Sequence, residues 1–283
     1  MKNVTLNNGV AMPMIGFGVY QIEPSEAQRA VEDALEVGYR LIDTAAAYSN
    51  EEGVGAAIAK CGVKREELFV TTKLWVQDYG YENALKAFDV SMKKLGLDYL
   101  DLYLMHKPYG DYYGAWRALE KLYNEGRIRA IGVTSFWNER LADLMNCNEV
   151  APAVNQIETN VWRQQRAAAE FMAKHGVCHQ AWAPFAEGKN DVFNEPTLQA
   201  LAGKYGKTTA QIMLRWLIQR GISVIPKTTH KERMIQNLDV FDFELTEEEV
   251  NTTVAALDLG KSLIYDEMDP EIAFFIGSLK IHD

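Results

Sequence analysis

Four polar residues near the ends of short apolar segments together have the chemistry of a proton-transfer site. Asp43 ends one such segment and Tyr48 follows five residues later, while Lys73 and His106 follow the next two segments. A neighbouring ammonium group favours the phenolate form of a buried tyrosine, so we expect Lys73 to lower the pKa of Tyr48 against the opposing effect of burial. Asp43 would keep Lys73 charged and in place, because an unpaired buried ammonium tends to lose its proton.

The chemistry that this set predicts is delivery of a proton to a reacting oxygen. His106 can hydrogen-bond a carbonyl oxygen, and Tyr48 can donate to that oxygen as negative charge builds on it. Each residue alone also has an ordinary structural explanation, such as a helix cap, a solvated lysine or a structural histidine. The set lacks an activated serine or cysteine nucleophile. Carbonyl reduction would also require a hydride, which side chains cannot supply, so a nicotinamide cofactor is expected.

Short apolar segments alternate with amphipathic ones along the chain, as parallel strands covered on both faces by helices do. The expected strands are Met14–Gly18, Leu41–Asp43, Leu68–Thr72, Leu100–Met105, Ala130–Val133, Ala153–Glu158, Val177–Trp182 and Ser223–Ile225. The expected helices are Ser25–Val37, Glu51–Lys60, Tyr81–Leu95, Tyr113–Asn124, Asn138–Met145, Gln164–His175, Pro196–Tyr205, Thr208–Gln219 and Lys231–Leu238. Before them, residues 4–6 and 10–12 flank Asn7-Asn8-Gly9 and predict a β-hairpin.

Two capping boxes and one irregular region complete the expected elements. Ser25-x-x-Gln28 predicts the start of the first helix, and Thr246-x-x-Glu249 predicts the start of a late one. The acidic residues 247–249 would form its solvated first turn, where the helix dipole favours carboxylates. From Leu259 the chain is expected to be irregular, and its apolar residues would close a substrate pocket; these are Ile264, Tyr265, Phe274 and Phe275.

Eight strands alternating with helices, without a linker-like stretch, predict one (β/α)₈ TIM barrel domain over residues 1–283. The alternative is a doubly wound sheet, which should have Gly-x-Gly-x-x-Gly directly after its first strand. Residues 16–21 do not complete that pattern, and residues 53–58 match it only weakly, with Ile58 in place of the third glycine. In a barrel the active site lies at the carboxyl ends of the strands, which brings the four polar residues to one rim.

The composition excludes several classes of function. With 39 acidic and 29 basic residues the chain has a net charge of −10, opposite to that of a general nucleic-acid or anionic-membrane binder. No apolar stretch approaches 18 residues and the N-terminus lacks a signal-peptide core, so we expect a cytoplasmic protein without a membrane partner. Its 3 cysteines have no zinc-binding spacing, so no metal site is expected. We also expect a monomer.

Four motifs in order along the chain resemble those of the aldo-keto reductases. They are Asp43-Thr44-Ala45-x-x-Tyr48, Thr72-Lys73-Leu74-Trp75, Leu104-Met105-His106-x-Pro108 and Ile225-Pro226-Lys227-Thr228. The resemblance extends over nearly the whole chain and implies a reductase of aldehydes and ketones that uses NADPH without a Rossmann fold. It also implies that Tyr48 is the proton donor, that Lys73 and Asp43 tune it, and that His106 orients the carbonyl.

The resemblance further implies a set of cofactor-binding residues. Lys227, Thr228 and Arg233 match the family residues that bind the adenosine 2′-phosphate. Independently of the family, two cations and a hydroxyl after the last strand of a barrel would suit a phosphate. Asn237 matches the adenine contact. The nicotinamide contacts are matched by Thr134, Ser135, Asn155, Gln156 and Trp182.

Several positions depart from the usual pattern of the family. Ser135 replaces an amide side chain that helps to bind the carboxamide, and Trp182 replaces a tyrosine, offering a larger face for stacking. Lys107 replaces the tryptophan or glutamine that commonly follows the histidine, and Gln236 stands where the family often has glutamate.

Residues Tyr20, Trp75, His106 and Tyr109 are expected to line the substrate mouth, which would suit small aldehydes, ketones or dicarbonyls. The chain resembles the prokaryotic branch that includes diketogluconate and methylglyoxal reductases. Two alternatives stay open: a binding or structural protein on the same scaffold, and a Schiff-base enzyme with Lys73 as nucleophile. The second needs a neutral lysine, which Asp43 disfavours.

Overall fold

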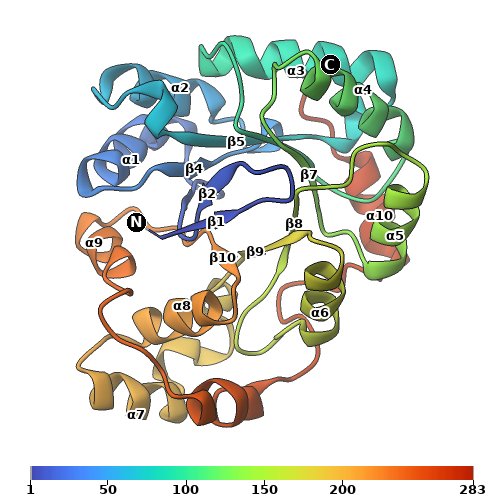
Figure 1. Ribbon diagram of the computed structural model, residues 1–283. Coiled ribbons are helices and arrows are strands. Elements are labelled where there is room, and N and C mark those ends of the chain that lie inside the picture. The colour runs from blue at the N-terminus through green and yellow to red at the C-terminus, as the bar shows by residue number, and fades with distance from the viewer. Residues whose placement is uncertain (1, 283) are drawn as a thin grey trace.

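The computed structural model describes residues 2–282, and its centre is a barrel of eight parallel strands (Figure 1). In order around the barrel the strands are β3 (Phe17–Gly18), β4 (Leu41–Asp43), β5 (Phe69–Leu74), β6 (Leu102–Met105), β7 (Ile131–Thr134), β8 (Val154–Glu158), β9 (Cys178–Trp182) and β10 (Ser223–Val224). A parallel bridge between Ile15 and Val224 joins the last strand to the first. This arrangement confirms the predicted barrel and excludes the doubly wound sheet.

The barrel closes where its backbones approach most closely. Gly16 N donates a hydrogen bond to Val224 O at 2.8 Å, and Val224 N donates to Met14 O at 2.9 Å. A Cβ on Gly18 would lie 2.9 Å from the carbonyl oxygen of Ile225, so this position has room only for glycine. Residues 14–16, expected to be part of the first strand, therefore make the closing contacts just before β3.

The predicted hairpin forms and covers the amino end of the barrel. Its strands β1 (Asn3–Thr5) and β2 (Ala11–Pro13) pair antiparallel, and Gly9 adopts a φ of 84° in the turn. Leu6 and Met12 are buried in one apolar cluster with barrel residues such as Leu41 and Leu102. A larger apolar cluster lies between the barrel and the surrounding helices. The hairpin thus seals one end, and the opposite end is left for a pocket.

Helices surround the barrel, mostly within a residue or two of the expected bounds. They are α1 (Pro24–Val37), α2 (Glu51–Lys60), α3 (Tyr81–Leu95), α4 (Tyr112–Asn124), α5 (Asn138–Asn146), α6 (Arg166–Lys174), α7 (Pro196–Tyr205), α8 (Thr209–Gln219), α9 (Lys231–Leu238) and α10 (Pro270–Ser278). The first capping box was predicted wrongly. α1 begins at Pro24, whose fixed φ suits the first helical position, and no side chain caps it.

Two further expectations fail near the C-terminus. Thr246 and Glu249 do exchange the hydrogen bonds of a capping box, at 2.8 and 3.2 Å, but Glu249 is not solvated. It is 7% exposed and accepts hydrogen bonds from Lys204 and Tyr205 at 2.7 and 2.6 Å, because α7 packs against this turn. The region after Leu259 is not wholly irregular either, since α10 forms with Asp269 as its N-cap.

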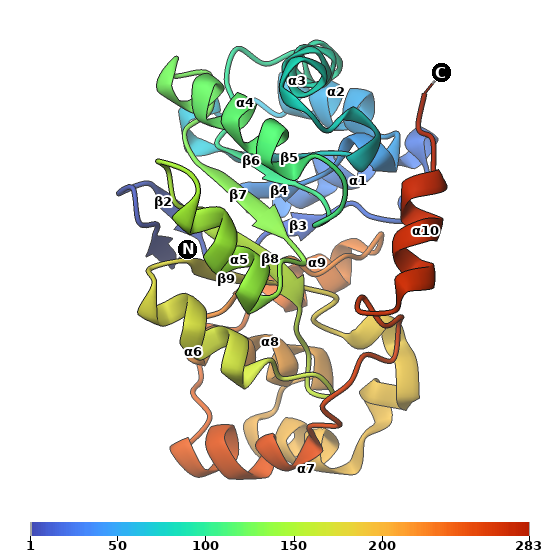
Figure 2. The same cartoon turned by 90° about the vertical axis from the view of Figure 1, so that its right-hand side faces the viewer.

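The hairpin and α10 lie at opposite ends of the barrel (Figure 2). α10 therefore stands over the carboxyl ends of the strands, where the predicted site residues are. Within residues 2–282, none of the helices combines the length and the apolar character needed to cross a membrane.

A buried histidine in the barrel predicts loss of stability in acid. His179 Nε2 lies 2.7 Å from Thr159 Oγ1, and burial lowers the pKa of its imidazole from 6.5 to about 3. Between pH 6.5 and pH 3 the imidazole is protonated in the unfolded chain but neutral in the folded one, so the unfolded chain binds more protons. The free energy of unfolding therefore decreases as pH falls from 6.5 toward 3. The slope from this one group is at most about 1.4 kcal/mol per pH unit.

Chemical denaturation across this pH range measures the effect. His179→Gln, which keeps a polar side chain beside Thr159, should show a shallower acid slope than the wild type. His175→Gln, on the surface after α6, is the matched control and should keep the wild-type slope. Equal slopes in all three proteins would contradict the assignment.

Candidate active site

Three neighbouring strands bring the four predicted catalytic residues together. Asp43 is the last residue of β4, Lys73 lies near the end of β5, and His106 directly follows β6. Tyr48 ends a short 3₁₀ helix over Ala46–Tyr48 in the loop after β4. Because β4, β5 and β6 are adjacent and parallel, these side chains meet at the carboxyl rim of the barrel.

Asp43 and Lys73 form a buried ion pair at the base of the site. The Lys73 ammonium is fully buried, donates to Asp43 Oδ1, and donates to the carbonyl oxygen of Thr44 at 2.9 Å. Gln156 Nε2 donates to the other carboxylate oxygen of Asp43 at 2.8 Å. Burial lowers the pKa of Lys73, and Asp43 opposes that shift. The predicted pairing is therefore present, and it limits the effect of burial on Lys73.

The Tyr48 hydroxyl lies 3.5 Å from Lys73 Nζ, but its pKa does not shift in the predicted direction. The pKa of Tyr48 is raised well above its usual value, because the surrounding protein removes the hydroxyl from water and the Asp43 carboxylate adds to the effect. The expectation of an acidified phenol is thus wrong for this structure. The positive charge of Lys73 is already paired, so desolvation dominates.

His106 stands beside Tyr48 as a neutral imidazole. Burial lowers its pKa well below 6.5, and the charges of Lys73 and Lys107 add to this shift. Its ring lies 5.6 Å from that of Tyr48 and 5.2 Å from that of Trp75. His106 Nδ1 is buried without a hydrogen-bond partner within the described chain. A neutral imidazole here can offer one N–H to a ligand without adding positive charge.

A cavity of about 840 Å³ opens above these residues. Of the four residues expected at the substrate mouth, Tyr20, Trp75 and His106 line it. Tyr109 does not line it; its hydroxyl donates instead to the backbone oxygen of Glu267 at 3.1 Å. The segment after β10 closes one side, as expected, with Ile264, Tyr265 and Phe275 among the lining residues. Phe274 points away and is 74% exposed.

The predicted nicotinamide contacts come from three neighbouring strands: Thr134 and Ser135 lie at the end of β7, Asn155 and Gln156 lie within β8, and Trp182 ends β9. Gln156 gives both protons of its amide nitrogen to Asp43 and Gln180, while no hydrogen bond to its Oε1 is found within residues 2–282. Asn155 is engaged at both ends by the backbone of Phe136. Gln156 and Trp182 line the cavity, and Asn155 does not.

The predicted phosphate contacts follow β10 and continue into α9. Lys227 and Arg233 are exposed, and neither forms an ion pair within the described part of the chain. Thr228 is buried, and its Oγ1 accepts from His230 N at 3.2 Å. Asn237 is buried near Tyr39, whose hydroxyl donates to the backbone oxygen of Met234 at 3.3 Å. Two unpaired cations therefore stand on the side of the rim formed by the last strand.

The comparisons with known proteins agree with this geometry. Residues 14–258 match the model of the aldo/keto reductase family. The chain belongs to this family. It is 46% identical over 250 residues to the glyoxal reductase of Bacillus subtilis, covering 88% of this chain and 90% of that one. It is 45% identical over 263 residues to the methylglyoxal reductase DkgA of Escherichia coli, covering 92% and 94%.

A solved structure supports the same assignment. The aldo-keto reductase of Bombyx mori in complex with NADP has a TM-score of 0.89 with this chain at 37% identity. The match covers 93% of this chain and 95% of that one. The chain and this member of the aldo/keto reductase family therefore share a fold over nearly their full lengths.

Sequence reasoning missed one part of this reductase site. Lys107 was noted only as a departure from the family pattern, but its ammonium forms a buried ion pair with Glu267 at 3.0 Å. It also donates to Ser135 Oγ at 3.0 Å and to the Tyr265 hydroxyl at 2.6 Å. Glu267 lies 160 positions away in the sequence, so no local pattern predicts the contact. A lysine at a strand end beside the predicted catalytic histidine was the only available signal.

The residues that could bind a metal are few. Within residues 2–282 no cluster of three or more His, Cys, Asp or Glu side chains has the arrangement of a metal site.

Proposed function

We propose that this protein reduces small aldehydes, ketones or dicarbonyls to alcohols with NADPH. The observation that supports this most directly is the Tyr48 hydroxyl, 3.5 Å from the Lys73 ammonium and beside a neutral His106, at the floor of an aromatic cavity. Names of relatives point the same way, since they include a glyoxal reductase and a methylglyoxal reductase.

The residues on the rim fit a dinucleotide phosphate. Gln156 Oε1 is left to accept from a carboxamide, and Trp182 has a flat face on which a nicotinamide ring could stack. Lys227, Thr228 and Arg233 would hold the 2′-phosphate, and Asn237 the adenine. Thr134, Ser135 and Asn155 would complete the nicotinamide end. When bound, the cofactor supplies the hydride that no side chain can provide.

In this proposal each catalytic residue acts on the carbonyl oxygen or on its neighbour. Tyr48 is protonated at neutral pH, as an ordinary phenol also is, and it gives that proton to the oxygen as alkoxide character develops. His106 donates a hydrogen bond to the same oxygen and thereby fixes its position. Lys73 faces the phenolate that remains, and Asp43 holds Lys73 in place. Proton transfer is favourable because an alkoxide is a stronger base than a phenolate.

The substrate class follows from the walls of the cavity. Tyr20 and Trp75 supply aromatic surface, whereas the polar groups gather at the base near His106. Such a pocket suits compact carbonyl compounds that place one oxygen at the base. Tyr109 does not line this cavity, so we do not propose it as a substrate contact.

Oxidation of NADPH by the purified protein tests the proposal. A panel of glyoxal, methylglyoxal, an aromatic aldehyde and a ketose should show turnover with at least one small carbonyl. Binding of NADPH without turnover of any member would favour a binding protein on the same scaffold. Trapping of a substrate on Lys73 by borohydride, without cofactor, would favour the Schiff-base enzyme.

A cofactor-preference experiment tests the phosphate contacts. Lys227→Ala and Arg233→Ala should each weaken NADPH binding by roughly 10- to 100-fold, since a hydrogen bond to a charged group contributes about 1.5–3 kcal/mol. Binding of NADH, which lacks the 2′-phosphate, should change little. Lys231→Ala is the charge-matched control, because Lys231 already pairs with Glu36 at 2.7 Å. Equal losses for both cofactors would contradict the assignment.

We further propose that residues 1–283 act as one barrel domain, that the protein is a cytoplasmic monomer, and that neither nucleic acid nor membrane is a partner. The acidic net charge of −10 supports the absence of polyanionic partners. Size-exclusion chromatography with light scattering would measure the oligomeric state.

A further inference from the structure

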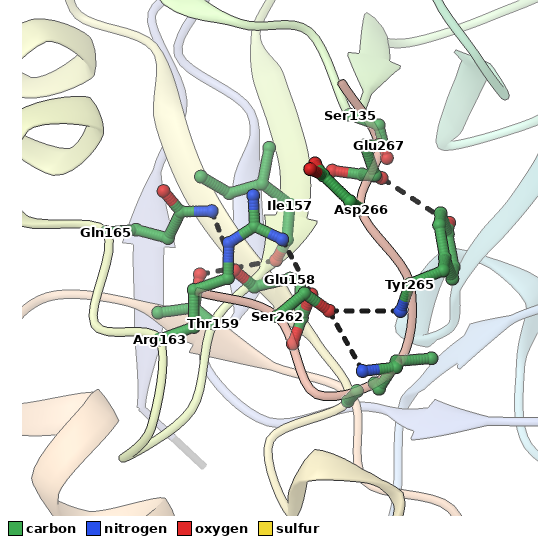
Figure 3. A network of polar contacts seen from close by, with 12 residues as sticks. Ser135, Ile157, Glu158, Thr159, Arg163, Gln165, Ser262, Tyr265, Asp266 and Glu267 are labelled. Carbon is green, nitrogen blue, oxygen red and sulfur yellow. Dashed lines mark hydrogen bonds and ion pairs between the residues drawn. The ribbon is translucent and has the colours of Figure 1, made fainter. Parts of the chain in front are cut away.

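The C-terminal segment Ser262–Glu267 enters the space where the proposed cofactor would place its nicotinamide. Tyr265 stacks against Trp182, with ring centroids 6.0 Å apart and ring planes 16° apart. In Figure 3 this segment runs past Ser135, and the Tyr265 hydroxyl points to the carboxylate of Glu267. The segment thus contacts Trp182, which is proposed to stack on the ring, and it is linked to Ser135 through Lys107, which donates to both Ser135 and Tyr265.

A nicotinamide ring cannot fit between Tyr265 and Trp182 as they stand. Aromatic carbons in contact approach to roughly 3.5 Å, so a ring between two others needs about 7 Å between their planes. The observed 6.0 Å between centroids is less than that. Stacking of a cofactor on this face of Trp182 therefore requires Tyr265 to move.

Tyr265 lies on the side of Trp182 that faces the active site. The Lys107 ammonium is 5.6 Å from the Trp182 ring and 5.1 Å from the Tyr265 ring, and it also contacts Ser135. Lys107 directly follows the catalytic His106. Tyr265 also lines the same cavity as Tyr48 and His106. The ring consequently occupies the inner face, not the outer one.

One ion pair holds this segment against the rim. Glu267 is 6% exposed, although Asp266 and Met268 on either side of it are exposed. Its carboxylate accepts from Lys107, and its backbone oxygen accepts from the Tyr109 hydroxyl. Lys107 also donates to the Tyr265 hydroxyl at 2.6 Å, whereas Ser262 Oγ accepts only from within the segment, from the backbone of Ile264 and Tyr265. The polar contacts of residues 262–267 with the barrel therefore converge on Lys107 and Tyr109, and local opening has to break these contacts.

We propose that Tyr265 occupies the nicotinamide position on Trp182 in the cofactor-free protein, and that the Lys107–Glu267 ion pair holds it there. This inference rests on the proposed function, because it takes Trp182 as the stacking surface. Binding of the cofactor then has to displace residues 262–267. The apparent affinity is reduced by the fraction of molecules in which the segment is closed.

Titration of the full-length protein with NADP⁺, followed by calorimetry, tests the proposal. Tyr265→Ala removes the competing ring and should tighten NADP⁺ binding by about tenfold if one molecule in ten is open in the wild type. Glu267→Gln keeps the ring but weakens the ion pair, and should tighten binding by a smaller factor. Asp266→Asn changes the same charge on the neighbouring exposed residue, and should bind as the wild type does.

Stopped-flow binding supplies a second measurement. In the wild type the observed rate of NADP⁺ association should level off at high concentration, limited by opening of the segment, and Tyr265→Ala should raise that plateau. Tyr265→Phe keeps the ring and loses the hydroxyl contact with Lys107, so it should raise the plateau less. Melting temperatures without NADP⁺ show whether each variant is folded. If Tyr265→Ala does not fold, binding by Tyr265→Phe and Glu267→Gln tests the displacement of Tyr265 instead.

The outcomes separate this inference from the proposed function. Weaker or unchanged NADP⁺ binding in folded Tyr265→Ala and Glu267→Gln would overturn the displacement model, because Tyr265 would then pack beside the bound cofactor. Carbonyl reduction by the wild type would still support the proposed function in that case. Failure of every protein, the wild type included, to bind NADP⁺ would overturn both.

Discussion

Replacing Tyr48 with phenylalanine should lower the rate of carbonyl reduction by roughly 10²- to 10⁴-fold, the usual contribution of a positioned proton donor. The change removes only the hydroxyl that lies 3.5 Å from Lys73 Nζ. The ring contacts with Tyr20 and His106, at 5.0 and 5.6 Å between centroids, remain possible for phenylalanine. Single-turnover measurements with NADPH already bound report the chemical step directly.

NADPH binding and thermal stability should change little in this variant, which distinguishes loss of chemistry from loss of structure. Tyr81→Phe, at the start of α3 on the outside of the barrel, is the matched control and should keep wild-type turnover. A Tyr48→Phe protein with wild-type single-turnover rates would mean that another group delivers the proton. His106 would then be the first candidate, as the nearest N–H donor in the cavity.

Removing one member of the Asp43–Lys73 pair should destabilise the fold by about 3–5 kcal/mol, because the remaining charge is left buried without its partner. Both side chains are almost fully buried, at 2% and 0% exposure. Asp43→Ala and Lys73→Met should each show this loss in urea unfolding at neutral pH. The double variant should lose clearly less than the sum of the two, since it buries no unpaired charge.

Activity should behave differently from stability in this series. The double variant regains stability but has no ammonium beside Tyr48, so its turnover should stay as low as that of Lys73→Met. Lys121→Met, on α4, breaks an exposed pair with Glu125, and should change the unfolding free energy little, because exposed ion pairs contribute little to stability. Additive losses of stability for Asp43 and Lys73 would argue against a coupled buried pair.

The comparison of sequence with structure shows which inferences a local pattern can support. The apolar segments Leu41–Asp43 and Leu100–Met105 have the length and composition of buried parallel strands, and both strands formed within two residues of their expected bounds. The barrel follows from their alternation with helices, because parallel neighbours need crossovers and eight of them close. Once the barrel is inferred, the meeting of Asp43, Lys73 and His106 at one rim follows as well.

Local patterns failed where a distant segment decides the environment of a residue. Glu249 has the sequence of a solvated helix start, yet α7 covers it and supplies Lys204 and Tyr205 as partners. The helix over Pro270–Ser278 was missed because its apolar residues have no clear helical spacing, although the Asp269-Pro270 start is a local signal that was available.

The amino-acid sequence by itself determined the family, the barrel and the residue types of the site, since these depend on order and spacing along the chain. Only the tertiary structure decided the electrostatics and the occupancy of that site. Desolvation around Tyr48 exceeds the effect of an ammonium already paired with Asp43, so the phenol pKa rises instead of falling. The Lys107 ammonium forms an ion pair with Glu267, which lies 160 positions away in the sequence. In the same region Tyr265 stacks on Trp182. Both results depend on how much water and charge surround a group in three dimensions, which no linear spacing specifies.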